Sequence, residues 1–172
     1  ISQTVNGKTI TYVTDTNRSL SRVLSIEKDG KTTDYVYGIG LIYQVDDKND
    51  YKTYHYDSRG STVAITDKNA VITDKMVYGP YGELLEKTGK TDTPFLYNGQ
   101  YGVQTDSNGL YYMRARYYNP EIKRFINQDV LIGTMTDSTS LNRYSYVNGN
   151  PISFTDPFGT DKDKQESKGW FS

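Results

Sequence analysis

A short tyrosine motif that recurs ahead of a turn is the feature that most constrains the fold. The copies read YVYG, YHYDSRG and VYGPYG, and they start at residues 35, 54 and 77. Alternate residues of a β-strand share a face, so the rings of each copy would lie on one side of a sheet while the Gly or Asp turn reverses the chain. Self-similarity at this period predicts a repeat architecture in which each unit is a hairpin.

The chain ahead of the first copy shows the same character. Apolar and polar residues alternate over short runs, and these runs are Thr9–Val13, Arg22–Ile26 and Thr33–Tyr37. Turn signals separate them at Asn6-Gly7, Thr16-Asn17 and Asp29-Gly30. Such alternation between turn dipeptides is typical of a meander of antiparallel strands. No stretch shows sustained helical periodicity, so the sequence predicts an all-β fold.

Composition indicates how such a sheet would be buried. Hydrophobic residues make up 35% of the chain and the mean hydropathy is −0.73, but Tyr alone occupies 17 positions. Amphipathic rings must therefore supply much of the core. We interpret the spaced tyrosines as an interior ladder on which successive repeats stack. The alternative is an exposed platform on which carbohydrate rings would stack, as in a surface adhesin.

Several classes of chemistry are disfavoured. The chain has no Cys, so it forms no disulfide, thiolate metal site or Cys nucleophile. A single His, His55, argues against a His-based metal site or a Ser-His triad. We expect no cofactor and no metal, and we interpret the acidic cluster at 46–50 as a solvated turn. A net charge of −1 gives no electrostatic reason to expect nucleic acid as a partner, and no apolar run suggests membrane insertion.

The C-terminal third carries a denser motif. It reads GLYYMRARYYNPEIKRFINQD over residues 109–129 and LNRYSYVNGNPISFTDPFG over residues 141–159. Strand alternation through Leu110–Tyr118 predicts one continuous strand with Arg114 and Arg116 on the same face. An arginine between tyrosines can stack on the rings and still donate to a carboxylate, so we interpret these two arginines as a packing and charge stitch inside a sheet.

These ordered landmarks resemble the Rhs repeat-associated core domain of the Rhs/YD-repeat family of bacterial polymorphic toxins. The stretch YHYDSRGSTVAITDKNAVI is similar to the YD repeat itself. The resemblance implies a Tyr-rich antiparallel sheet that forms part of a β-cage and ends in a core plug with little helix. It divides the chain into YD-repeat strands at 1–86, the core at 87–159 and a polar variable tail or junction at 160–172.

The resemblance also implies a function. The chain would be the structural C-terminal part of a shell that encapsulates or presents a toxin effector, in a secreted or cell-surface bacterial protein. Its partners would be the rest of the shell and the enclosed toxin. Unpaired strand edges predict self-association of the isolated chain. The first residue is not Met, which suggests a fragment, and the 13-residue tail is too short to be a toxin domain.

Many members of this family cut themselves just after the terminal DPxG motif, when two aspartates converge. By resemblance the pair here would be Asp129 and Asp156, with Arg124 shaping their electrostatics and the cut in the region of Gly159 and Thr160. Two close carboxylates cannot both ionise, so one would act as general acid while the other activates water.

The chain departs from the family pattern in three places. Thr160 stands where a Leu is common, Val130 replaces the Pro after the first aspartate, and the two aspartates are 27 positions apart, more than is usual. The alternative interpretation is architectural: Asp156 caps a turn and Asp129 satisfies backbone donors. An active aspartyl autoprotease and a shell without enzymatic activity are therefore both hypotheses.

Overall fold

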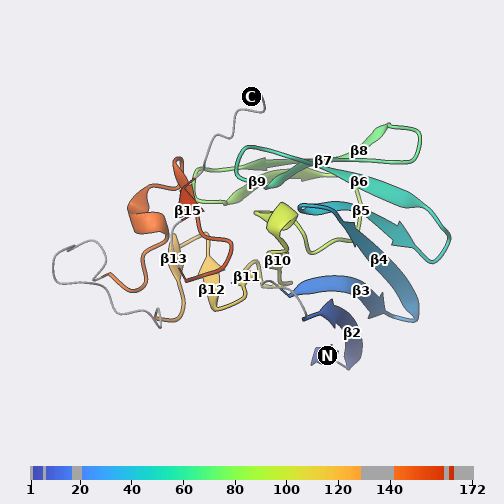
Figure 1. The fold of residues 1–172 in the computed structure, drawn as a ribbon, viewed down its shortest axis with the longest axis horizontal. Helices are drawn as coiled ribbons and strands as arrows, with labels where there is room; N and C mark the ends of the chain where they lie inside the picture. The colour runs from blue at the N-terminus through green and yellow to red at the C-terminus, as the bar shows by residue number, and fades with distance from the viewer. Residues whose placement is uncertain (1, 6, 17–20, 129–141, 161–162, 165–172) are drawn as a thin grey trace.

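The computed structural model describes residues 2–5, 7–16, 21–128, 142–160 and 163–164. Its largest element is a nine-stranded sheet whose strands are antiparallel and adjacent in sequence order (Figure 1). The strands are β1 (Ser2–Val5), β2 (Lys8–Asp15), β3 (Arg22–Lys28), β4 (Lys31–Tyr37), β5 (Leu41–Asp46), β6 (Tyr51–Tyr56), β7 (Thr62–Thr66), β8 (Ile72–Tyr78) and β9 (Leu84–Thr88). The predicted all-β meander is confirmed.

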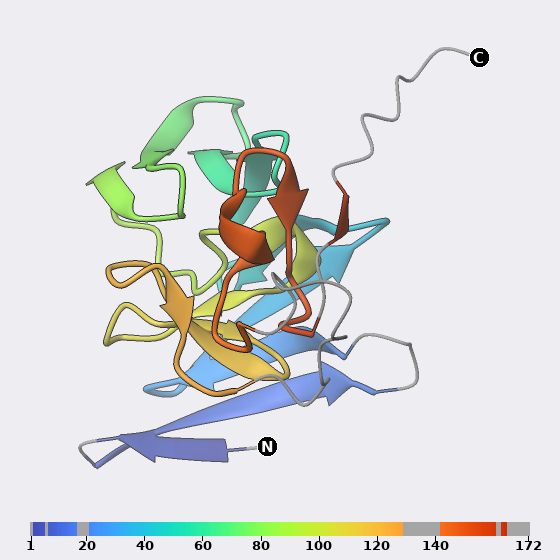
Figure 2. The same cartoon turned by 90° about the vertical axis from the view of Figure 1, so that its left-hand side faces the viewer.

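The chain then turns back across this sheet. A 3-10 helix η1 (Gly99–Tyr101) precedes a second antiparallel sheet of β10 (Gln104–Thr105), β11 (Tyr111–Met113), β12 (Arg116–Asn119) and β13 (Arg124–Phe125). A further 3-10 helix of the described residues, η3 (Val147–Gly149), leads to β14 (Phe154–Thr155), which pairs with β15 (Asp163–Lys164). We call residues 94–128 and 142–160 the C-terminal unit; Figure 2 shows it in front of the long sheet.

Each tyrosine motif forms the end of a hairpin. Tyr37, Tyr56 and Tyr78 are the last residues of their strands, and at each of them the register with the next strand shifts as in a β-bulge. Tyr56 Oη donates to the Leu41 carbonyl (2.8 Å), and Tyr78 Oη donates to the Thr62 carbonyl (3.0 Å). The same contact therefore joins successive hairpins, as expected for a stacked repeat.

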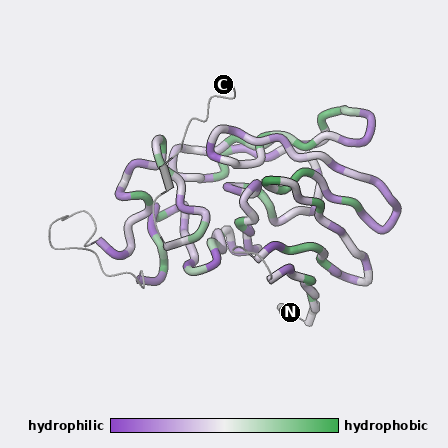
Figure 3. The backbone as a smooth tube through the Cα atoms, in the orientation of Figure 1, coloured by the Kyte–Doolittle hydropathy of each residue, from purple (hydrophilic) through white to green (hydrophobic). Residues whose placement is uncertain are grey.

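Two aromatic clusters form the core. One lies on the long sheet and includes Tyr35, Tyr54, Ile65 and Phe95. The other lies in the C-terminal unit and consists of Tyr97, Val103, Tyr111, Met113, Tyr118, Phe125, Tyr146 and Val147. Tyr78 packs against both clusters, so the two sheets share one continuous interior. In Figure 3 the purple, hydrophilic stretches gather at hairpin tips, while the strands alternate.

The glycines of three hairpins are where the C-terminal unit docks. A Cβ on Gly40 would lie 2.6 Å from Gln100, on Gly60 2.4 Å from Tyr101, and on Gly82 2.8 Å from Tyr97. These three contacts all fall within the segment Tyr97–Tyr101. The hairpin glycines are therefore needed for close approach as well as for turning.

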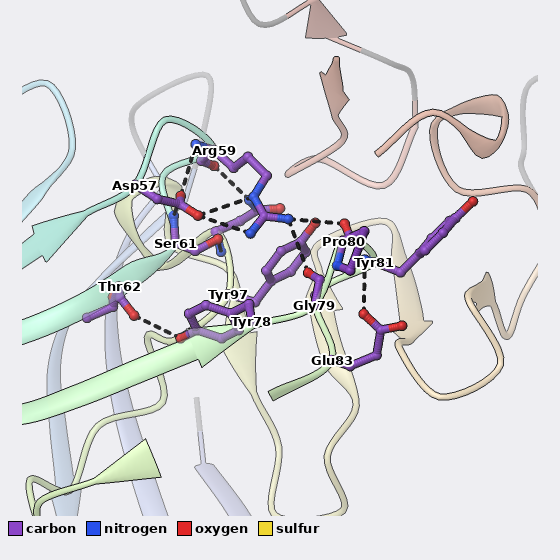
Figure 4. A network of polar contacts seen from close by, with 12 residues as sticks. Asp57, Arg59, Ser61, Thr62, Tyr78, Gly79, Pro80, Tyr81, Glu83 and Tyr97 are labelled. Atoms are coloured by element: carbon purple, nitrogen blue, oxygen red, sulfur yellow. Dashed lines mark hydrogen bonds and ion pairs between the residues drawn. The ribbon is translucent and has the colours of Figure 1, made fainter. Parts of the chain in front are cut away.

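Arg59 connects two neighbouring hairpins (Figure 4). It pairs with Asp57 at 3.1 Å, donates to the carbonyls of Gly79 (3.2 Å) and Pro80 (3.0 Å), and lies 5.7 Å from the centre of the Tyr97 ring. Asp57 also accepts from the backbone amides of Arg59 and Ser61, both at 2.9 Å. The YDSRGS motif thus stabilises its own turn through Asp57 and is hydrogen-bonded through Arg59 to the turn of the next hairpin.

The prediction of one strand through Leu110–Tyr118 is wrong. Met113 pairs with Arg116, so the segment is a hairpin with Arg114 and Ala115 in its turn. Arg114 has a φ of 55°, a left-handed conformation that ends the strand. The alternation of apolar and polar residues does not reveal this turn, because neither Arg114 nor Ala115 is a usual turn former. The turn is instead held by contacts with residues 157 and 158.

Candidate functional site

The DPFG turn, Asp156 to Gly159, is built around one buried carboxylate. Asp156 is 2% exposed, and its Oδ1 accepts from the backbone amides of Gly159 (2.7 Å) and Thr160 (3.2 Å). Gly159 has a φ of 69°, and a Cβ there would lie 2.6 Å from the Met113 carbonyl. The sequence Asp-Pro-x-Gly therefore folds into an Asx turn that fits closely against the β11–β12 hairpin.

Arg116, on β12, is the cation of this site. It is 5% exposed and pairs with Asp156 Oδ2 at 3.2 Å. Its Nε donates to the Gly159 carbonyl and its Nη1 donates to the Arg143 carbonyl at 3.1 Å. The guanidinium lies 3.6 Å from the centre of the Phe125 ring. A buried charge with this many acceptors is well compensated, and the planar fork of arginine suits several acceptors at once.

Arg114, in the turn of the β11–β12 hairpin, contacts the same DPFG turn. Its Nη1 donates to the Pro157 carbonyl at 3.0 Å, and its Nη2 donates to the Tyr101 carbonyl. The guanidinium also lies 5.7 Å from the centre of the Phe158 ring. Burial lowers the pKa of the Arg114 guanidinium below its ordinary value. Arg114 in the β11–β12 turn and Arg116 at the start of β12 therefore both hold the DPFG turn.

The residues predicted from the sequence fall into three groups. Asp156, Gly159 and Thr160 lie together in this turn. Arg124 is exposed on β13 and lines a surface pocket with Tyr81, Asn142 and Gly149. Asp129 lies outside the described residues. Its distance from Asp156, and with it the dyad, stays a prediction.

Sequence reasoning missed the role of Arg116. The sequence predicted that Arg114 and Arg116 stack on tyrosine rings and pair with carboxylates inside a sheet. It assigned Arg124, not Arg116, to the candidate site. The signal for Arg116 was partial, because an arginine among tyrosines predicts an acidic partner without saying which one. Only the hairpin turn at 114–115 brings Arg116, 40 positions before Asp156, against the DPFG turn.

Two buried charged side chains contact the peptide bond between Gly159 and Thr160. The Gly159 carbonyl, which begins the Gly159–Thr160 bond, accepts a bond from a buried guanidinium, and a carboxylate contacts the amides on both sides. A charged donor on a carbonyl oxygen polarises it and can stabilise the oxyanion that forms during attack. The same contacts also suffice for a purely structural turn.

The tyrosines are mostly interior. Tyr35, Tyr54, Tyr97, Tyr111, Tyr118 and Tyr146 are each at most 5% exposed, and Tyr12, Tyr37, Tyr56, Tyr78 and Tyr81 pack against the two clusters. Burial raises the pKa of Tyr54 and Tyr146 well above the ordinary value for tyrosine. Rings in this position cannot serve as a carbohydrate platform, which counts against the adhesin alternative.

The described ranges offer neither a metal cluster nor a membrane-spanning helix. In that part of the chain, no group of three or more His, Asp or Glu residues is placed to hold a metal ion. None of the helices described there has the length and apolar character required to span a bilayer.

Comparison with solved structures identifies the fold of this chain. The chain adopts the fold of a chain in the crystal structure of TcdB2-TccC3-Cdc42, with a TM-score of 0.66 and 23% identity over 92% of this chain and 8% of that one. No family model matches the sequence. The fold that the two chains share is almost wholly antiparallel β-sheet.

Two relatives in sequence are bacterial proteins, one named as a nuclease and the other as a toxin. The tRNA3(Ser)-specific nuclease WapA of Bacillus spizizenii is 33% identical over 165 residues, which is 92% of this chain and 7% of that protein. The double-stranded DNA deaminase toxin A of Burkholderia cenocepacia is 35% identical over 112 residues, which is 62% of this chain and 7% of that protein. The chain thus spans only about 7% of the length of these relatives.

These names bear on one expectation from the sequence. Net charge suggested that nucleic acid is not a partner, but relatives of this chain are named as nucleases or as a DNA deaminase. The exclusion of nucleic acid is therefore not supported. Charge over a segment that covers so small a share of a protein says little about the partners of the whole.

Proposed function

We propose that this chain is the C-terminal part of an Rhs/YD-repeat shell, and that it closes the shell and presents or encloses a toxin effector. The docking of Tyr97–Tyr101 on the glycines of three hairpins carries this proposal. In the proposed shell, this docking would fasten the C-terminal unit to the inner face of the repeat sheet and so close the shell. The toxin-related homologues and the small share of their length that is matched support the same interpretation.

The proposal assigns a role to each segment. Residues 1–86 are repeat strands of the wall, residues 87–159 are the core that closes it, and residues 160–172 lead to the effector. Among the described strands, β1 pairs only with β2, so earlier repeats of a longer chain could continue the sheet there. The isolated chain would self-associate at that edge. The parent would be a secreted or cell-surface bacterial protein.

Electron microscopy of the purified parent protein tests the shell. We expect a closed, hollow particle with this segment at one end and added density inside. An open or extended sheet with the downstream segment outside would refute the proposal. Docking is tested by the Gly60→Gln and Gly82→Gln double variant, which should open the particle, against Gly30→Gln, where the added side chain has open space.

A second candidate function is self-cleavage at the Gly159–Thr160 bond, favoured by the contacts of Arg116 and Asp156 with that peptide. In this mechanism Asp156, whose charged form is stabilised by Arg116, takes a proton from water as the water oxygen attacks the Gly159 carbonyl carbon. Asp129, the proposed acid, gives a proton to the Thr160 nitrogen as the C–N bond breaks. Gly159 becomes a carboxylate and Thr160 a free amine. Arg116 stabilises the oxyanion, and Arg124 stays a candidate for shaping the field at Asp129.

Intact-mass spectrometry of the parent protein tests this reaction. The wild-type chain should yield a new amino terminus at Thr160, and Asp129→Asn, Asp156→Asn and Arg116→Lys should each abolish it. Arg59→Lys is the matched control, since Arg59 also pairs with an aspartate but lies in the repeat hairpins. A single unbroken wild-type mass would leave Asp156 and Arg116 as architecture and would not affect the shell proposal.

A further inference from the structure

Three consecutive residues of the β11–β12 hairpin bind three consecutive carbonyls of the DPFG turn. The Arg114 side chain donates to the Pro157 carbonyl (3.0 Å), the Ala115 backbone amide to the Phe158 carbonyl (3.3 Å), and the Arg116 side chain to the Gly159 carbonyl. The two segments are thus matched residue by residue. A slip of the turn by one position would take all three donors away from their present acceptors.

Arg114 is held in an unusual conformation for this task. Its φ of 55° is in the left-handed region, which a residue with a Cβ rarely adopts. This backbone makes the tight turn from which Arg114 and Arg116 both reach residues 157–159. Strained residues persist where the surrounding contacts hold them, and they gather at functional sites.

Arg114 also anchors the turn to the rest of the C-terminal unit. Its Nη2 donates to the Tyr101 carbonyl, at the end of the segment that docks on the hairpin glycines. A Cβ on the next residue, Gly102, would lie 3.0 Å from that Nη2, so the approach is close. One guanidinium therefore connects the docking segment to the DPFG turn, which lysine, with a single ammonium group, cannot do in the same geometry.

We propose that Arg114 is a positioning residue that sets which peptide bond is presented to Asp156. Arg116 and Asp156 contact the Gly159–Thr160 peptide directly, but a guanidinium can bind any carbonyl that slides into its reach. Arg114 and Ala115 hold the two preceding carbonyls and so exclude the neighbouring registers. This inference rests on the proposed self-cleavage and deepens it, since it concerns the choice of bond rather than the bond-breaking step.

The first test is the position of the cut in the parent protein. Arg114→Ala should slow cleavage by on the order of 10²-fold, the cost of a misplaced reacting group, and should spread the new amino termini over bonds next to Thr160. Arg114→Lys should give an intermediate rate with the same spread. The control Arg59→Ala removes an arginine that also binds two backbone carbonyls, and it should keep a single terminus at Thr160. A single terminus at the control's rate in Arg114→Ala would overturn the proposal.

The second test does not need cleavage. Amide hydrogen exchange of residues 158–160 is compared between Asp129→Asn and the double variant Asp129→Asn with Arg114→Ala. We expect faster exchange, confined to this turn, in the double variant. Equal exchange in the two variants would overturn the proposal that Arg114 holds the DPFG turn in position. If the wild-type chain is never cut, the self-cleavage proposal fails by itself, while the exchange result still decides whether Arg114 holds the turn in register.

Discussion

At the scale of single residues, Gly82 is required both for its backbone conformation and for the space that the absence of a side chain leaves. The two requirements can be tested separately. Its φ is 86°, and a Cβ would lie 2.8 Å from atoms of the fully buried Tyr97 ring. Gly82→Ala should therefore lower the free energy of unfolding by about 2–4 kcal/mol, the sum of backbone strain and overpacking. Urea unfolding measures the loss.

The matched control for Gly82 is Gly30→Ala. Gly30 has a φ of 74°, but no atom lies within 4 Å of the position that a Cβ would take there. Only backbone strain remains at this residue, and a loss of about 1 kcal/mol is expected. Equal losses at both positions would contradict the claim that the C-terminal unit docks on the hairpin glycine.

Residue identity predicted the fold better than it predicted the site. The Tyr motifs indicated the hairpins and the interior ladder because strand alternation and turn chemistry are local. Asp156 and Gly159 were named from the resemblance to the family's DPxG motif, and the alternative that Asp156 caps a turn rests on a local pattern as well. Arg116 was missed because its partner is set by a contact across 40 positions, and no local pattern distinguishes Arg116 from Arg124.

At the scale of elements, Asp74 joins strand β8 to the loop after β9. Its carboxylate is 1% exposed and accepts from the Thr91 amide (2.9 Å), the Thr91 hydroxyl and the Thr73 hydroxyl (2.6 Å). Burial acts to raise the pKa of Asp74, but the hydrogen bonds from Thr73 and Thr91 prevail and lower it. The loop that leads to the docking segment is therefore held by an ionised carboxylate.

Asp74→Asn should destabilise the fold at pH 7 by about 1–3 kcal/mol, because an amide replaces an acceptor with a donor in a buried site. A folded pKa below the unfolded one gives stability that is present above the unfolded pKa and lost as the pH falls through the folded pKa. The difference between the two proteins should therefore shrink in that acidic window. Asp67→Asn, in the β7–β8 turn, is the control. A loss independent of pH would count against the ionised state.

Strand prediction from the sequence succeeds for β2, β3 and β4 and is wrong for the hairpin at 111–119. Strands β2, β3 and β4 contain the three predicted runs, since their turns carry Gly or Asn. The hairpin at 111–119 was predicted as one strand because Arg114 and Ala115 carry no turn signal. There the turn is held by the carbonyls of residues 157 and 158, which a local pattern cannot report.

At the scale of the whole molecule, Asp106 lies where the first strands approach the C-terminal unit. Its carboxylate is hydrogen-bonded by Tyr117 of β12, and its charge helps to raise the pKa of Tyr12 of β2. Burial raises the pKa of Asp106 above its ordinary value, against the opposing effect of the Tyr117 bond. Folding therefore opposes the ionised form of this group.

The sign of the effect follows from linkage. A folded pKa above the unfolded one gives stability that is complete below the unfolded pKa and is lost as the pH rises through the folded pKa. Asp106→Asn keeps an acceptor for Tyr117 and removes the charge, so the variant should be more stable than the wild type at pH 7. The advantage should disappear at a pH below the unfolded pKa, where both side chains are neutral. Urea unfolding of both proteins across this range is the measurement, and a variant that is less stable at every pH would show that the carboxylate is held by contacts beyond Tyr117.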